Sequence, residues 1–113
     1  MTRTRTLMTL GTVAVAMAGF GGQAALTGAA TTKSIAVDDD FFSPKKASIK
    51  KNTTVTWRWR GENPHNITPT SSLKFKKAAT KRSGRHKVKF TKAGTFRYVC
   101  TIHDGMTGSI VVK

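Results

Sequence analysis

The feature that most constrains the fold is the alternation of apolar and polar residues in short runs. The clearest run is Thr53–Arg60, where Val55, Trp57 and Trp59 alternate with threonines and arginines. Because successive side chains of a β-strand point to opposite faces, this pattern predicts a strand with one buried face. Further short runs are found at Ser34–Asp38, Ala47–Lys50, Asn66–Thr68, Arg85–Phe90, Thr95–Cys100 and Ser109–Lys113. Short strands with turn residues between them, and no convincing helix, predict an all-β sandwich.

Two connections carry local signals. Lys51-Asn52 is expected to form a turn, because Asn tolerates a positive φ better than most residues. The stretch Pro69–Ser83 is rich in lysine and has the least regular pattern of the chain. We expect a solvated loop there, with one poor strand around Leu73–Phe75.

The first 30 residues differ in composition from the rest. Arg3 and Arg5 precede the uncharged run Leu7–Phe20, and small residues follow up to Ala30. The run is about 14 residues long, short of the roughly 20 needed to span a bilayer. This order predicts a Sec-type secretory signal peptide with a small-residue linker, cleaved within residues 24–31. The remaining single domain, residues 31–113, is then exported; an uncleaved membrane anchor is the alternative.

The exported domain is strongly basic. The chain has 20 Lys and Arg against 5 Asp and Glu, so removal of Arg3 and Arg5 leaves 18 against 5, a net charge of +13. An exported protein does not ordinarily meet nucleic acid, and the basic run Lys74–Lys92 lacks the repeated interleaving of aromatic residues that single-strand binders use. We therefore expect docking to an acidic partner protein, or association with an anionic membrane or cell wall. The alternative is that the positive charge serves only to keep the protein soluble.

The single cysteine, Cys100, excludes an intrachain disulfide and any four-cysteine metal site. Small exported domains have marginal cores, so a metal is the next candidate stabiliser. Cys100, His103 and Met106 lie in one short segment after an apolar strand, and His65 follows Pro64 at the end of another. Two imidazoles, a thiolate and a thioether are the ligands of a blue-copper electron-transfer centre, whereas methionine is a poor zinc ligand.

Each of these residues also has an ordinary interpretation. A lone cysteine is usually a buried small hydrophobe, a lone loop histidine is usually solvated, and Met106 alone fits a core. Their joint spacing favours copper. A nucleophilic Cys–His pair is the enzymatic rival, but its base usually comes from far away in the sequence, which fits Cys100 and His103 poorly. We therefore expect no enzyme activity.

Several segments then carry a family resemblance. They are Phe42-Ser43-Pro44, Val55-Thr56-Trp57, Pro64-His65-Asn66, Gly94–Cys100, and the C-x-x-H-x-x-M loop that runs into Gly108–Val112. From about Lys33 to Lys113 the chain resembles a small cupredoxin of the plastocyanin and amicyanin type. The resemblance implies a Greek-key sandwich that holds one type-1 copper ion.

The resemblance also assigns roles to individual residues. His65, Cys100 and His103 are implied as equatorial ligands and Met106 as the weak axial ligand. Asn66 is implied to tie its strand to Thr101. Ile102 stands where the relatives have proline, so it restores a backbone N–H that we expect to point at the sulfur of Cys100.

These features predict an exported, monomeric copper protein that shuttles one electron between larger redox partners. The family resemblance implies that His103 is the route for the electron. One alternative is copper storage or delivery with the same ligands. The other is a cationic wall- or membrane-binding protein with a structural metal. Outside the site, we expect Trp57 in the core, His86 as a partly buried structural histidine, and Asp38-Asp39-Asp40 as a solvated turn.

Overall fold

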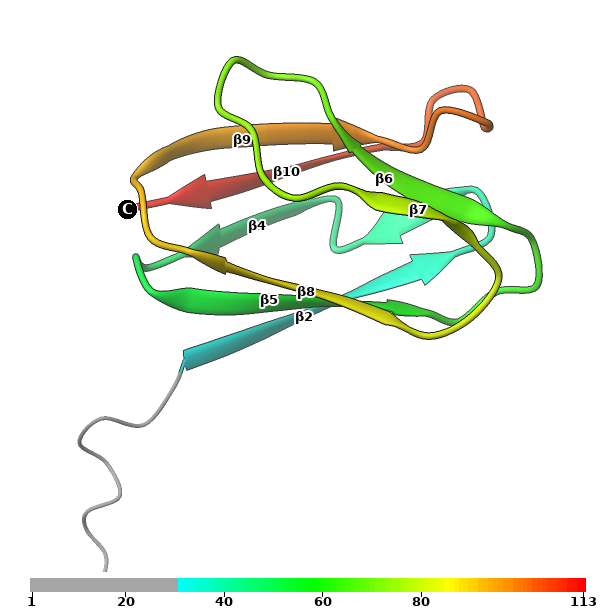
Figure 1. The fold of residues 1–113 in the computed structure, drawn as a ribbon, viewed down its shortest axis with the longest axis horizontal. Coiled ribbons are helices and arrows are strands. Elements are labelled where there is room, and N and C mark those ends of the chain that lie inside the picture. The colour runs from blue at the N-terminus through cyan, green and yellow to red at the C-terminus, as the bar shows by residue number, and fades with distance from the viewer. Residues whose placement is uncertain (1–30) are drawn as a thin grey trace, which may run out of the picture.

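A computed structural model describes residues 31–113 as two β-sheets that face each other across one core (Figure 1). This confirms the expected all-β sandwich. The signal peptide expected in residues 1–30 lies outside the described residues. Between residues 31 and 113 no helix is present, and so none there is long and apolar enough to cross a membrane.

The first sheet has four strands in the order β3-β2-β5-β8. These are β2 (Thr31–Asp38), β3 (Phe41–Ser43), β5 (Thr53–Trp59) and β8 (Arg85–Phe90). β2 runs parallel to β5, and the other two pairs are antiparallel. The alternation of β5 buries Thr53, Val55, Trp57 and Trp59, and it directs the residues between them outward.

The second sheet has five strands in the order β4-β10-β9-β6-β7. These are β4 (Lys46–Ile49), β6 (His65–Pro69), β7 (Ala78–Lys81), β9 (Gly94–Val99) and β10 (Thr107–Val112). β10 pairs parallel with β4 and antiparallel with β9. β6 pairs antiparallel with β9 through Thr68 and Pro69, so the start of β6 extends past the end of β9 and lies beside the residues that follow β9.

Aromatic side chains fill the space between the sheets. Trp57 is fully buried, which confirms its expected place in the core. Phe75 stacks on its ring at 5.4 Å between centroids, and Tyr98 meets it edge-on at 5.5 Å. Phe90 packs against both Trp57 and Phe75. Such offset and edge-to-face contacts stabilise a core beyond the area that they bury.

Two expectations about local structure have opposite outcomes. Asn52 has a φ of 72°, which confirms the turn at Lys51-Asn52. The strand expected around Leu73–Phe75 is wrong, because the strand of this region is Ala78–Lys81, which pairs with β6. Leu73 and Phe75 are instead partly buried loop residues that pack against the core.

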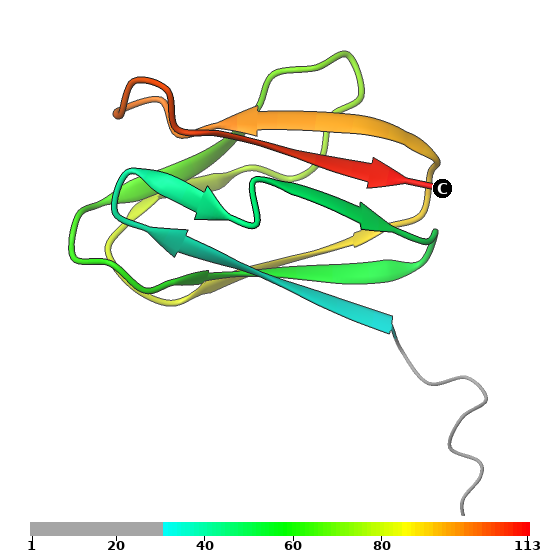
Figure 2. The same cartoon turned by 180° about the vertical axis from the view of Figure 1, so that it is seen from behind.

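The connections that matter for the site gather at one end of the sandwich. Figure 2 shows from behind that the β2–β3 turn, the β5–β6 loop and the β9–β10 loop lie at the end opposite the C-terminus. His65 opens β6, and Cys100 directly follows β9. The strand pairing therefore brings residues distant in sequence to one place.

Candidate metal centre

Three of the predicted ligands converge at this end. One ligand atom from each of His65, Cys100 and His103 lies within 4.8 Å of the others. The Nδ1 atom of His65 is 3.9 Å from the Sγ atom of Cys100, and the two imidazole rings have centroids 4.7 Å apart. His65 and Cys100 are buried, whereas the side chain of His103 is 23% exposed. The cluster is thus closed to solvent except at His103.

The β9–β10 loop folds these side chains together through its own backbone. The Cys100 N–H donates to the Met106 carbonyl at 2.9 Å, and the Met106 N–H donates to the His103 carbonyl at 3.3 Å. Gly105 has a φ of 75°, a left-handed conformation that suits glycine. The tight loop places Met106 near the other three residues, with its side chain buried.

A buried asparagine joins the two strand ends. The Asn66 side chain donates to the Thr101 hydroxyl at 2.8 Å and accepts from the Thr101 N–H at 3.1 Å. It also donates to Thr80 at 3.1 Å. The tie between Asn66 and Thr101, expected from the family resemblance, is therefore present.

The sulfur of Cys100 accepts one backbone hydrogen bond, from the Asn66 N–H at 3.4 Å. The donation expected from Ile102 has no counterpart among the hydrogen bonds of residues 31–113, and the Ile102 side chain is half exposed. A single donor moderates the negative charge of a thiolate less than two donors do.

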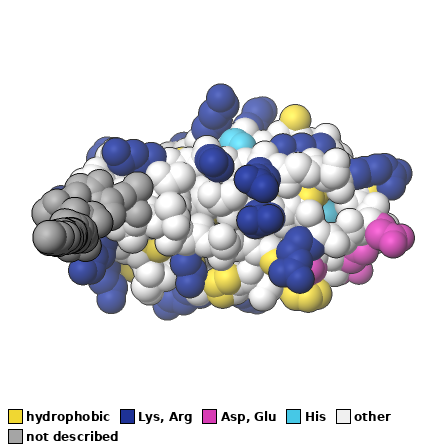
Figure 3. Space-filling view, turned by 90° about the horizontal axis from the view of Figure 1, so that it is seen from below, with side chains coloured by type: hydrophobic (Ala, Val, Ile, Leu, Met, Phe, Trp, Pro, Cys, Tyr) yellow, Lys and Arg dark blue, Asp and Glu magenta, His cyan; other side chains and the backbone are white. Residues whose placement is uncertain are grey.

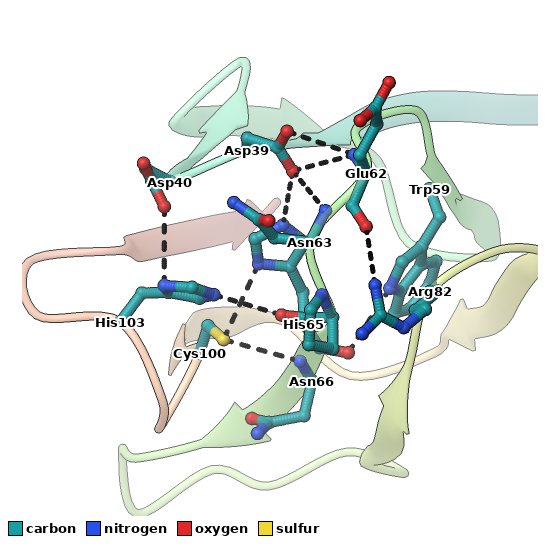
Figure 4. Close-up of polar contacts among 11 residues, drawn as sticks. Asp39, Asp40, Trp59, Glu62, Asn63, His65, Asn66, Arg82, Cys100 and His103 are labelled. Carbon is teal, nitrogen blue, oxygen red and sulfur yellow. Dashed lines mark hydrogen bonds and ion pairs between the residues drawn. The ribbon is translucent and has the colours of Figure 1, made fainter.

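Sequence reasoning missed Asp39, which it placed in a solvated turn. Its carboxylate accepts from the N–H groups of Glu62 at 3.0 Å and Asn63 at 2.8 Å, and it lies 3.2 Å from the Nε2 atom of His65 (Figure 4). These donors, led by the Glu62 N–H, hold the pKa of Asp39 below its usual value. No local pattern could signal this role, since Asp39 and His65 are 26 residues apart.

The Asp39 contact fixes the state of the His65 ring. An ionised carboxylate only accepts hydrogen bonds, so Nε2 carries the proton. In the neutral imidazole, which is the form that binds a metal, Nδ1 then keeps its lone pair, and it is Nδ1 that faces the sulfur of Cys100. A carboxylate behind a histidine ligand orients the ring and makes it a better donor to a metal.

His103 is held differently. Its Nε2 atom donates to the Pro64 carbonyl at 3.0 Å, and its Nδ1 atom lies 3.3 Å from the exposed carboxylate of Asp40. Both contacts come from the neighbouring turns at the same end (Figure 4). The ring is therefore positioned at the rim of the cluster, and a metal bound by it would replace one of the two contacts.

The remaining histidine lies away from this cluster. His86 is partly exposed on β8, where its Nε2 atom bonds to the Lys76 carbonyl at 2.7 Å and its ring packs on Trp57 at 5.8 Å. This is the structural role expected for it.

The donor set fits copper. Thiolate and thioether sulfur favour Cu(I), and imidazole nitrogen suits Cu(II) as well. Structural zinc sites, by contrast, use cysteine, histidine and carboxylate without methionine.

Comparison with known proteins agrees with this site. A family model described as a cupredoxin-like domain matches residues 11–112. Amicyanin from Paracoccus denitrificans is 32% identical over 76 residues, which cover 64% of this chain and 58% of that protein. Plastocyanin from Scenedesmus fuscus is 31% identical over 84 residues, covering 64% of this chain and 86% of that protein.

Solved structures give the same result for the fold. The Cu(I) form of an amicyanin mutant superposes with a TM-score of 0.66 at 27% identity, covering 80% of this chain and 90% of that one. A purple cupredoxin from Nitrosopumilus maritimus superposes with a TM-score of 0.65 at 23% identity, covering 72% and 99%.

The fold and the donor cluster define a single-domain β-sandwich metalloprotein. The chain belongs to the cupredoxin-like family. Copper is the cofactor that this membership and the donor set together indicate. The aligned region spans 58% of the length of the Paracoccus amicyanin.

Proposed function

We propose that His65, Cys100, His103 and Met106 hold one copper ion, and that the protein carries single electrons between redox partners. The observation that carries this proposal is the convergence of three donor atoms within 4.8 Å of one another, beside the buried Met106. Copper supplies the one-electron Cu(I)/Cu(II) couple when it is bound. The chain supplies a donor set that both oxidation states accept.

The surroundings of the donors suit reversible electron transfer without substrate chemistry. Asn66 and Asp39 hold the ligand-bearing segments from two sides, so little rearrangement is expected when the charge of the site changes. Cys100 is only 3% exposed and lies behind His103 with the buried Met106, so a substrate has no open approach to its sulfur as a nucleophile. These features support a carrier in preference to an enzyme.

The exit route for the electron is the exposed edge of His103. Two large apolar side chains flank this end, Phe41 at 54% exposure and Ile102 at 50%. Exposed apolar residues around a functional group are typical of a protein docking patch. We propose that a redox partner docks here.

The location and the partners follow from the rest of the chain. The basic and apolar N-terminal segment supports export through a signal peptide. A net charge of +13 over residues 31–113 would attract acidic redox proteins or an anionic surface at long range. We propose a monomeric, exported carrier.

The test is an absorption spectrum after addition of Cu(II) to the metal-free protein. An intense visible thiolate-to-copper band is expected, and Cys100→Ala should abolish it while the far-UV spectrum still reports a β-sandwich. His86→Gln is the matched control, because this histidine lies outside the cluster, and it should keep the band. A band that survives in Cys100→Ala would contradict the assignment.

Voltammetry then separates a carrier from a protein that only stores or delivers copper. A carrier gives a reversible wave with fast electron exchange, since the donors hold both oxidation states. Release of the metal on each reduction would favour storage or delivery.

A further inference from the structure

The charged side chains are segregated along the molecule. All five Asp and Glu side chains of the chain belong to the metal end: Asp38 at the end of β2, two in the β2–β3 turn, one in the β5–β6 loop and one in the β9–β10 loop. Figure 3, a view from below, shows acidic side chains gathered at one end of the molecule, whereas Lys and Arg are spread over the whole of this face, including positions beside the acidic side chains. Within residues 31–113, the two ion pairs are both between a histidine and an aspartate. None of the 18 lysines and arginines there is paired with a carboxylate.

One sheet face concentrates these unpaired cations. On β8 the exposed residues are Arg85, Lys87 and Lys89, while the residues between them turn inward. Arg85 lies directly opposite Arg58 of β5 in the strand register. We call Arg58, Arg85, Lys87 and Lys89 the basic face. Like charges directly opposite each other on a sheet are destabilising. A negatively charged partner outside the protein would offset this cost.

The small side chains beside these cations make the surface open. Lys87 and Lys89 pair with Thr56 and Thr54 of β5, and those threonines pair with Ser34 and Thr32 of β2. Three further lysines, Lys74, Lys76 and Lys92, line a groove that adjoins β8. The result is a broad cationic surface in which short side chains leave the charged ones free to reach a partner.

Protection of a sheet edge explains only part of this arrangement. Lysines on an edge strand such as β8 prevent pairing with other chains. Arg58, however, lies on the interior strand β5. Edge protection also does not explain why the one carboxylate of this sheet, Asp38, stands at the metal end of β2.

The surface lacks what a protein partner usually needs. Stable protein interfaces are centred on exposed aromatic or aliphatic anchors. In the part of the chain that the structure describes, the large exposed apolar side chains are Phe41 and Ile102, and both belong to the metal end. Cations without apolar anchors instead match peripheral attraction to anionic lipid headgroups.

We propose that the basic face binds an anionic lipid bilayer, and that the carboxylates keep the metal end directed away from it. Attraction at the face and repulsion at the metal end act together, so the bound protein has one preferred orientation. His103 and the apolar residues near it then stay accessible to a redox partner. The binding itself does not depend on copper, so it is tested separately from the electron-carrier function.

The first experiment measures sedimentation of the exported protein with phosphatidylcholine vesicles that do or do not contain phosphatidylglycerol, at low salt. Binding should require the anionic lipid. The triple variant Arg85→Gln, Lys87→Gln, Lys89→Gln should lose about a hundredfold in partitioning, because each cation near an anionic surface contributes about fivefold.

A second triple variant provides the matched control. Lys45→Gln, Lys46→Gln and Arg97→Gln remove the same charge from exposed positions on or next to the five-stranded sheet. This variant should lose less than about tenfold. Equal losses in the two variants would overturn the proposal, since net charge alone would then explain the binding. Far-UV spectra check that both variants fold.

A second readout tests the orientation and the class of partner. Spin-labelled lipid headgroups should broaden the amide NMR signals of β8 and spare those of residues 101–105 in the metal-free protein. Broadening at the metal end would contradict the orientation. Strong binding to soluble polyphosphate without binding to anionic vesicles would overturn the bilayer in favour of an anionic polymer.

Discussion

Asp39 shows how one side chain links two loops to a metal ligand. Its carboxylate accepts hydrogen bonds from Glu62 and Asn63, within the β5–β6 loop, and from His65. The negative charge lies behind the imidazole and not in the donor cluster itself. It therefore acts on the metal through His65, as a positioning residue.

Asp39→Asn should raise the reduction potential of the copper protein and weaken its affinity for Cu(II) by about ten- to a hundredfold. Asparagine keeps the shape but removes a negative charge that stabilises Cu(II) more than Cu(I). Voltammetry and a competitive Cu(II) titration measure the two effects. Asp38→Asn makes the same charge change with no hydrogen bond to His65 and should change both far less. Equal effects in the two variants would mean that the potential and the Cu(II) affinity depend only on the charge, and that the contact between Asp39 and His65 has no role.

Tyr98 is a buried titratable residue at the centre of the core. Burial raises the pKa of Tyr98 to about 12, and its hydroxyl has no hydrogen-bond partner among the described residues. Below pH 10 the phenol is protonated in both states and its contribution to stability is complete. As the pH rises from 10 to 12, the unfolded chain ionises first, so about 2–3 kcal/mol of stability is lost.

Tyr98→Phe should remove this part of the alkaline loss and cost little at neutral pH, because the hydroxyl is unpaired. The chain contains a single tyrosine, so tyrosinate absorbance reports its ionisation directly. Denaturant unfolding of both proteins across this pH range gives the stability difference. Tyrosinate absorbance that rises at pH 10 while the protein is still folded would contradict the prediction.

At the scale of elements, the strands that sequence could predict are those with period-two alternation. Thr53–Arg60 and Arg85–Phe90 match β5 and β8 closely, because each has one face in the core. Phe41–Ser43 and Ala78–Lys81 were not identified as strands. Both are short strands at the edges of their sheets, held by pairing with one neighbour, so no alternating core face marks them.

The candidate site was predictable for a related reason. Cys100, His103 and Met106 lie within one loop, so their spacing alone indicates a cluster. His65 could be assigned to the site only from the family resemblance or from the strand pairing. Asp39 could be assigned only from the three-dimensional structure. Contacts between separate turns depend on where the neighbouring strands end relative to each other. The local sequence pattern does not encode this relative position.

The β9–β10 loop offers a test at its exposed position. Since the hydrogen bond to sulfur comes from Asn66, we expect Ile102→Pro to leave the reduction potential nearly unchanged. Proline removes only the N–H of Ile102 and restricts its φ. Voltammetry gives the potential, and the visible spectrum shows whether the ligand geometry is kept. A clear fall in potential with an intact spectrum would mean that Ile102 does donate to the sulfur.

At the scale of the whole molecule, the net charge is strongly positive, but the negative side chains gather near the metal cluster. The described residues carry +13, yet all five Asp and Glu side chains lie at the metal end. Exposed charges are screened beyond about 10 Å at 0.1 M salt. A small partner that approaches His103 therefore feels mostly the nearby carboxylates once salt is present.

Electron transfer to the anion ferricyanide should consequently depend on ionic strength less steeply than a charge of +13 implies. The single-site variant Asp104→Asn removes a carboxylate next to His103 and should raise the rate at 0.1 M salt about two- to threefold. Lys92→Gln is the distant control, since the six-residue strand β9 separates Lys92 from the site. At about 3.3 Å per residue, that separation is roughly 20 Å, or two screening lengths. Stopped-flow measurements give the electron-transfer rates of the unmodified protein and of the two variants. If Lys92→Gln slows the reaction as much as Asp104→Asn speeds it, the net charge controls encounter and the local carboxylates do not.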